Sequence, residues 1–156
     1  MELFTSIDDI LDYVIEQEDE SHRFYIHMAE VHAEKGGDFF AEFAAEELKH
    51  KARLIAVKEN KIRFSEGVEH LNVTFADHDV DCSYDGTGDY VRTLEVAINR
   101  ETKTLALYNQ LASLTQSSEL EKALLRLAEG ERRHKERLEK ILEEHTLKTG
   151  CEIKTS

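Results

Sequence analysis

The stretch FAAEELKHKARL, residues 43–54, occurs a second time in the chain as LAEGERRHKERL, residues 127–138. Each copy contains a Glu-x-x-His motif followed by a Lys-x-Arg-Leu segment, at Glu47/His50 and at Glu131/His134. Residues three apart on an α-helix project side by side from one face, so each motif presents a carboxylate and an imidazole together. One Glu-x-x-His occurs by chance in many helices, whereas two copies in matching contexts indicate a paired site.

The repeat continues outside these motifs. Glu18 corresponds to Glu101, and Tyr25 to Tyr108, at a sequence offset of 83, while the two motifs are related by an offset of 84. Each half of the chain is therefore expected to form a helix hairpin, and two such hairpins build one bundle.

Apolar residues recur at helical spacing in four segments, which predict helices near 7–35, 38–59, 89–114 and 118–147. Ser6-x-x-Asp9 and Ser118-x-x-Glu121 have the form of capping boxes at two helix starts. Residues 60–88 lack this period and are rich in turn-forming residues, so they predict a long crossover between helices two and three. Residues 151–156 are expected to be a frayed tail. The fold class is thus all-α, a four-helix bundle in one domain over residues 1–156.

Net charge, apolar segments and cysteine positions argue against several classes of partner and site. A net charge of −13 argues against nucleic acid or an anionic membrane as a partner. No segment has the apolar length of a membrane span or the form of a signal peptide, which predicts a cytoplasmic protein. Cys82 and Cys151 lie far apart, which argues against a thiolate metal site or a disulfide framework.

Each of the four predicted helices carries one glutamate on its inward-facing apolar face. No Lys or Arg lies near that glutamate on the same face. Buried carboxylates cost several kcal/mol unless positive charge offsets them. Two divalent cations would balance four carboxylates, with one histidine completing each ion. Oxygen and imidazole donors suit iron or manganese, and zinc is chemically possible. The alternative is a metal-free bundle whose glutamates face solvent. The candidate metal ligands are Glu18, Glu47, His50, Glu101, Glu131 and His134.

Tyr25 and Tyr108 follow Glu18 and Glu101 by two helical turns and share their faces. They either pack in the core or donate hydrogen bonds that orient the carboxylates and tune the metals. On the second interpretation we class both as candidate catalytic residues.

These residues resemble the rubrerythrin-like branch of the ferritin-like superfamily. The resemblance rests on Glu18 with Phe24-Tyr25, Glu46-Glu47-x-x-His50, Glu101 with Tyr108, and Glu131-x-x-His134. It implies a ferritin-like bundle with a non-haem di-iron site, in which Glu47 and Glu131 bridge the ions and the other four ligands are terminal. Two features differ from the family pattern. The sequence lacks the four cysteines of a rubredoxin domain, and Thr104 stands where the family has a further glutamate.

Three functions are consistent with this pattern. The resemblance favours an oxidoreductase that reduces hydrogen peroxide or dioxygen, with electrons from an external donor such as a rubredoxin-like carrier, in defence against oxidative stress. The second is a non-catalytic protein that oxidises, stores or hands on iron. The third is a partner-binding bundle whose metals are structural. A homodimer is expected because symmetric dimers are the commonest oligomers.

Overall fold

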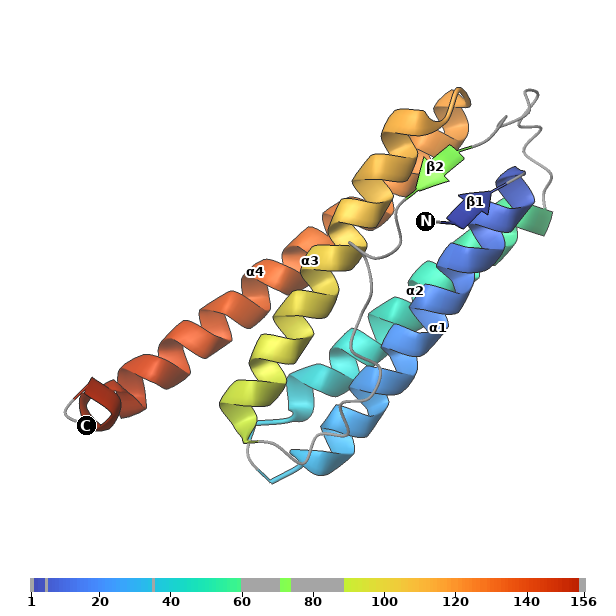
Figure 1. Ribbon diagram of the computed structural model, residues 1–156. Helices are drawn as coiled ribbons and strands as arrows, with labels where there is room; N and C mark the ends of the chain where they lie inside the picture. Colours follow the sequence, from blue (N-terminus) through green and yellow to red (C-terminus); the bar gives the residue numbers. More distant parts are fainter. Residues whose placement is uncertain (1, 5, 35, 60–70, 74–88, 155–156) are drawn as a thin grey trace.

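The computed structural model describes residues 2–4, 6–34, 36–59, 71–73 and 89–154. It contains four helices, α1 (Ile7–Val31), α2 (Asp38–Glu59), α3 (Tyr90–Leu114) and α4 (Ser118–Lys154). They form two antiparallel hairpins, α1–α2 and α3–α4, and α2 and α3 run in the same direction (Figure 1). The predicted all-α, ferritin-like four-helix bundle is confirmed.

Short polar side chains set the helix starts. Ser6 accepts a hydrogen bond from the backbone N–H of Asp9 at 3.1 Å and caps α1, as the capping box predicts. Asp89 caps α3 by accepting from the N–H of Arg92 at 2.7 Å. The predicted box at Ser118 is wrong by one residue. Ser117 is the cap, because its hydroxyl oxygen accepts from the N–H of Leu120 at 3.2 Å.

Two helix ends also differ from the prediction. Helix α1 ends at Val31 instead of residue 35, because the C-cap His32 leaves the helical conformation with a ψ of 23°. Gly36, with a positive φ of 81°, lies in the turn that follows. Helix α4 continues through Gly150 to Lys154, where a frayed tail was expected. One glycine costs a helix only about 1 kcal/mol, and no proline follows to end it.

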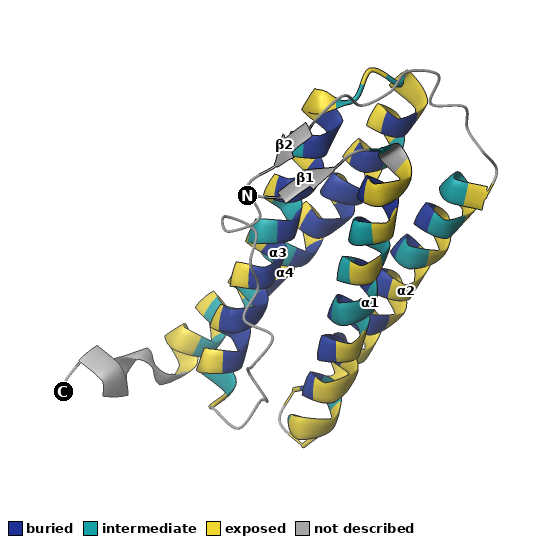
Figure 2. Cartoon of the chain, turned by 45° about the vertical axis from the view of Figure 1, so that its right-hand side comes forward, coloured by how far each residue is buried: buried dark blue, intermediate teal, exposed yellow. Residues whose placement is uncertain are grey.

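Each helix packs most closely against its hairpin partner. Buried residues lie on the faces that the two hairpins turn toward each other (Figure 2). The apolar ones form two clusters, one centred on Ile10, Leu11, Leu111 and Leu124, the other on Phe40, Phe43, Leu94 and Leu138. Among the described residues, no helix combines the length and apolar character needed to cross a membrane.

A short antiparallel ladder is an addition that the sequence reading did not predict. Strand β1 (Glu2–Phe4) pairs with β2 (Leu71–Val73), with Glu2 opposite Val73 (Figure 1). The predicted crossover at 60–88 lies outside the described residues, apart from β2. The description resumes at Asp89, directly before α3.

Candidate metal centre

The structure brings the six predicted ligands together in the middle of the bundle, one glutamate or one Glu-His pair from each helix. All six residues are buried, each between 1% and 6% exposed. Glu18 comes from α1, Glu47 and His50 from α2, Glu101 from α3, and Glu131 and His134 from α4. Carboxylates occupy the centre of an otherwise apolar core because the repeated motifs place them on the inner helix faces.

The donor atoms fall into two groups, each compact enough for one metal ion. The first group contains Glu18, Glu47, His50 and Glu131, and the second Glu47, Glu101, Glu131 and His134. Within each group the donor atoms lie within 4.8 Å of one another. Glu47 and Glu131 belong to both groups, so each has the position of a ligand shared by two ions.

Both histidines direct Nδ1 at the carboxylates. His50 Nδ1 lies 3.2 Å from Glu131 Oε1, 3.3 Å from Glu47 Oε2 and 3.5 Å from Glu18 Oε2. His134 Nδ1 lies 3.0 Å from Glu47 Oε1 and 3.6 Å from both Glu101 Oε1 and Glu131 Oε2. The two imidazole rings are nearly parallel, with their centroids 6.0 Å apart. Nδ1 is therefore the nitrogen that each ring offers to a metal.

The two tyrosines connect the hairpins across this cluster. Tyr25 on α1 donates its hydroxyl to Glu101 on α3, and Tyr108 on α3 donates to Glu18 on α1. Burial and the adjacent carboxylates raise the pKa of both phenols well above the ordinary value, so both remain hydrogen-bond donors.

The shared and unshared glutamates have opposite pKa shifts. Burial raises the pKa of Glu47 to about 8, and the charges of Glu18 and Glu101 add to this effect. Burial and the charge of Glu101 also hold the pKa of Glu131 well above its ordinary value. For Glu18, burial is outweighed by hydrogen bonds with Glu47 and His50, so its pKa lies below the ordinary value. Glu101 shows the same downward shift.

The histidines complete the charge balance. Burial opposes protonation of His50, but hydrogen bonds with Glu131, Glu18 and Glu47 outweigh it and raise its pKa to about 12. The pKa of His134 is raised for the same reason. Without metal, two ionised carboxylates thus face two imidazolium rings, and the buried charges cancel. Two divalent ions would restore the same balance with all four carboxylates ionised and both rings neutral.

The carboxylates fit such ions in a second respect. One oxygen each of Glu18, Glu47 and Glu101 (Oε2) is buried and lacks a well-directed hydrogen bond. Oε2 of Glu47 and of Glu18 lie 3.3 and 3.5 Å from His50 Nδ1, which is their nearest charged neighbour among the ion pairs described above. An unpaired buried oxygen is costly, whereas a metal ion would satisfy it. The residues present therefore have the donors, the charge and the unsatisfied oxygens that two divalent ions require.

Sequence reasoning missed two neighbours of the cluster. Nε2 of His134 hydrogen-bonds to Glu46, which precedes the shared ligand Glu47 on α2. Arg100, only 4% exposed, places its guanidinium 4.4 Å from the ring centroid of Phe24. The small Ser21 side chain, 3.5 Å from Arg100 Nη2, leaves room for the arginine between α1 and α3.

Thr104 makes a contact within its own helix. It is buried one turn after Glu101, and its hydroxyl donates to the backbone carbonyl of Arg100 at 3.0 Å. The position that holds a further glutamate in the resembled family therefore contributes an internal helix contact here.

Two comparisons with known proteins found a likeness to this chain. Residues 92–156 match the family model described as Rubrerythrin. A comparison with curated protein sequences gave no match. Among solved structures, a candidate ferritin-like diiron-carboxylate protein from Thermotoga maritima aligns with a TM-score of 0.75, covering 94% of this chain and 100% of that one. Sequence identity in the alignment is 22%, so this likeness shows a shared fold.

Proposed function

We propose that this chain, which has a ferritin-like fold and matches the Rubrerythrin family model over residues 92–156, is a di-iron carboxylate oxidoreductase that reduces hydrogen peroxide or dioxygen. The observation that carries the proposal is the pair of buried donor groups sharing Glu47 and Glu131. A site that holds two redox-active ions together suits a reaction that consumes two electrons, and reduction of one peroxide to two waters is such a reaction.

The six ligands have separate roles in this proposal. Glu18 and His50 would hold one ion, and Glu101 and His134 the other, because they belong to separate donor groups. Glu47 and Glu131, which belong to both groups, would be shared by the two ions. When bound, the iron would supply electrons to the oxygen substrate, and the two apolar clusters pack along the bundle around the site.

Tyr25 and Tyr108 act as positioning residues. Each holds a terminal carboxylate through a hydrogen bond from the opposite hairpin, so the unshared oxygen of that carboxylate keeps a fixed direction. Their raised pKa keeps both phenols protonated over the range in which the carboxylates are ionised. They therefore orient ligands without adding charge to the site.

The electrons are proposed to come from a separate carrier, such as a rubredoxin-like protein, because the sequence contains only two cysteines and cannot form a four-cysteine iron site. A cytoplasmic location, a homodimer and a role in oxidative stress remain predictions. Sedimentation or light scattering of the purified chain would test the dimer.

Anaerobic loading with ferrous iron tests the function. We expect two iron ions per chain, oxidised in one turnover by one equivalent of hydrogen peroxide, and repeated turnover when a reductant is added. Glu47→Ala should lose this reaction, whereas Glu42→Ala, which changes an exposed glutamate of the same helix, should keep it. Iron uptake far beyond two ions per chain would favour the storage alternative. Two bound ions that peroxide and dioxygen leave unoxidised would favour a structural role.

A further inference from the structure

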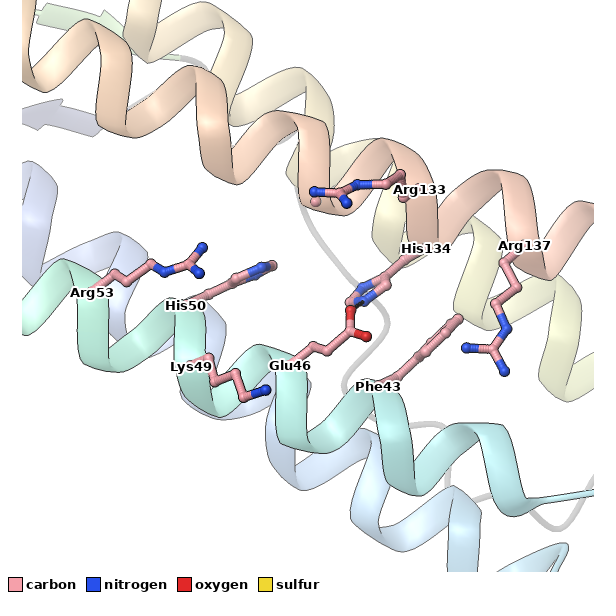
Figure 3. A pocket seen from close by; sticks show the side chains of 9 residues that line it. Phe43, Glu46, Lys49, His50, Arg53, Arg133, His134 and Arg137 are labelled. Atoms are coloured by element: carbon pink, nitrogen blue, oxygen red, sulfur yellow. Dashed lines mark hydrogen bonds and ion pairs between the residues drawn. The ribbon is translucent and has the colours of Figure 1, made fainter.

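A pocket of about 400 Å³ opens between α2 and α4, directly over the two ligand histidines (Figure 3). Four of its lining residues are cationic, Lys49, Arg53, Arg133 and Arg137, and only Glu46 is acidic. This basic rim stands out on a chain whose net charge is −13. Such a concentration of positive charge repels metal cations and attracts anions.

The internal repeat is broken at one position in this pocket. Glu46 and Gly130 are related by the same offset of 84 that relates the two histidines. Glu46 reaches across from α2 and hydrogen-bonds to Nε2 of His134 (Figure 3). Gly130 has no side chain to offer His50. A Cβ at this position would lie 2.8 Å from both Nε2 and Cε1 of that ring, so His50 occupies the space that a side chain would need.

His50 is consequently a buried ring with one unpartnered nitrogen. Its side chain lines the pocket, the residue is 6% exposed, and its polar contacts within the described part of the chain are all made through Nδ1. When Nδ1 serves as a metal ligand, the single ring proton lies on Nε2. This N–H then points into the pocket without the carboxylate that its counterpart on His134 has.

The cations beside His50 are available to an anion. Arg137 is engaged, since it pairs with Glu42 at 2.8 Å and lies over Phe43. Lys49, Arg53 and Arg133 form no ion pair within 4.0 Å among the residues that the structure describes. Figure 3 shows the side chains of Arg53 and Arg133 gathered on the His50 side of the pocket. Planar guanidinium groups bind carboxylates and phosphates through paired hydrogen bonds.

We propose that this pocket binds a small oxyanion, a carboxylate or phosphate, which accepts a hydrogen bond from Nε2 of His50 and is held by Arg53 and Arg133. The anion would accept a hydrogen bond from Nε2 of His50, as Glu46 does from Nε2 of His134. The His134 site thus has a carboxylate partner from the chain itself, and the His50 site has an exchangeable one. The binding itself does not depend on which reaction the centre performs.

Calorimetric titration of the full-length chain loaded with zinc tests the proposal. Sodium formate and inorganic phosphate are the two probes, used separately, and sodium chloride keeps the ionic strength constant. We expect saturable binding of one anion per chain for formate, phosphate or both, and the tighter probe identifies the class. Arg133→Gln should weaken binding by about tenfold or more, because it removes a charge-assisted contact. Arg132→Gln is the matched control, because Arg132 is exposed and pairs with Glu129 and Glu136 on its own helix.

Nitrogen-15 spectra of the histidine rings provide a second readout. On anion binding, the Nε2 resonance of His50 should shift, and that of His134 should stay in place. Glu46→Ala removes the only acid of the pocket lining and should tighten anion binding. The proposal is overturned if neither probe binds saturably, if Arg133→Gln binds as the unmodified chain does, or if only an acidic polymer such as polyglutamate binds. A shift confined to His134 would also overturn it.

Discussion

Tyr25 on α1 donates a hydrogen bond to Glu101 on α3, and this contact joins the two helix hairpins through the buried carboxylate cluster. The repeat-related residues, Tyr108 and Glu18, form the same contact in the opposite direction. Each hairpin therefore holds a terminal ligand of the other. A shift of one hairpin along the other would break both bonds, so the register of the bundle and the geometry of the site depend on each other.

Replacing Tyr25 with Phe should slow turnover while both metals stay bound. The change keeps the ring in the core and removes only the hydrogen bond to Glu101. Loss of a residue that orients a metal ligand typically lowers activity by about 10–100-fold. Metal content per chain and the rate of peroxide consumption should be measured together. Tyr90→Phe is the control, since Tyr90 hydrogen-bonds to Gly36, away from the cluster. An unchanged rate in Tyr25→Phe would show that the tyrosine only packs.

Replacing Glu47 with Ala should abolish paired metal occupancy. Glu47 belongs to both donor groups, so one substitution removes a ligand from each ion. Elemental analysis should find one ion per chain or fewer, and peroxide should no longer oxidise the protein in a single turnover. Glu42→Ala should retain two ions. Two ions and normal oxidation in Glu47→Ala would show that the residue does not bridge.

The metal-free fold should tolerate the Glu47→Ala substitution, because it removes one buried acid from among three others.

The metal-free protein should become less stable as the pH rises. Protonated Glu47 stabilises the fold at low pH, and this contribution is lost as the pH rises from 4.5 toward about 8. Protonated His50 acts in the same direction between pH 6.5 and about 12. Thermal unfolding of chelator-treated protein should therefore show a lower Tm at pH 9 than at pH 6.5, with each ~1 kcal/mol corresponding to about 2–4 °C.

Zinc-loaded protein should not lose stability over the same pH range, because the ions keep the carboxylates ionised and the imidazoles neutral. In the metal-free protein, Glu47→Gln should flatten the pH dependence, since it removes the group whose pKa lies near 8. A metal-free Tm that stays constant or rises between pH 6.5 and 9 would contradict the charge balance described for the cluster.

Helical spacing made the cluster predictable. Residues such as Glu47 and His50 share an inner face because they are three apart on a helix, and the repeat indicates that the other hairpin presents the same pair. The all-α bundle followed from that pattern and is confirmed. The resemblance to rubrerythrins agrees with the family model that matches residues 92–156.

What the sequence could not predict depends on how one helix lies against another. The contact of Glu46 with His134 joins α2 to α4, and it requires a register between helices that no spacing within one helix encodes. The burial of Arg100 depends on the space that Ser21 leaves on α1. The end of α1 at Val31 lies several residues before the glycine pair, so the pair alone could not locate it.

The contact between Glu46 and His134 makes the two metal sites unequal, and this inequality can be measured. A carboxylate that accepts the Nε2–H of a ligand histidine fixes the ring and increases its basicity. His134 has such a partner, whereas His50 has none among the described residues. Two ions should therefore bind in sequence, the first at the site of His134 and Glu101.

Glu46→Ala should remove this difference. Affinity at the His134 site should fall by about 10–100-fold, the usual effect of losing such a partner, and affinity at the His50 site should change less. Stepwise titration with cobalt or zinc in low-salt buffer free of carboxylates and phosphate would resolve the two binding events. Glu42→Ala, a change to another exposed glutamate of α2, should preserve two distinct steps. If Glu46→Ala still binds the first ion as tightly as the unmodified chain, the bond from His134 to Glu46 does not set the order of binding, and the two sites differ for another reason.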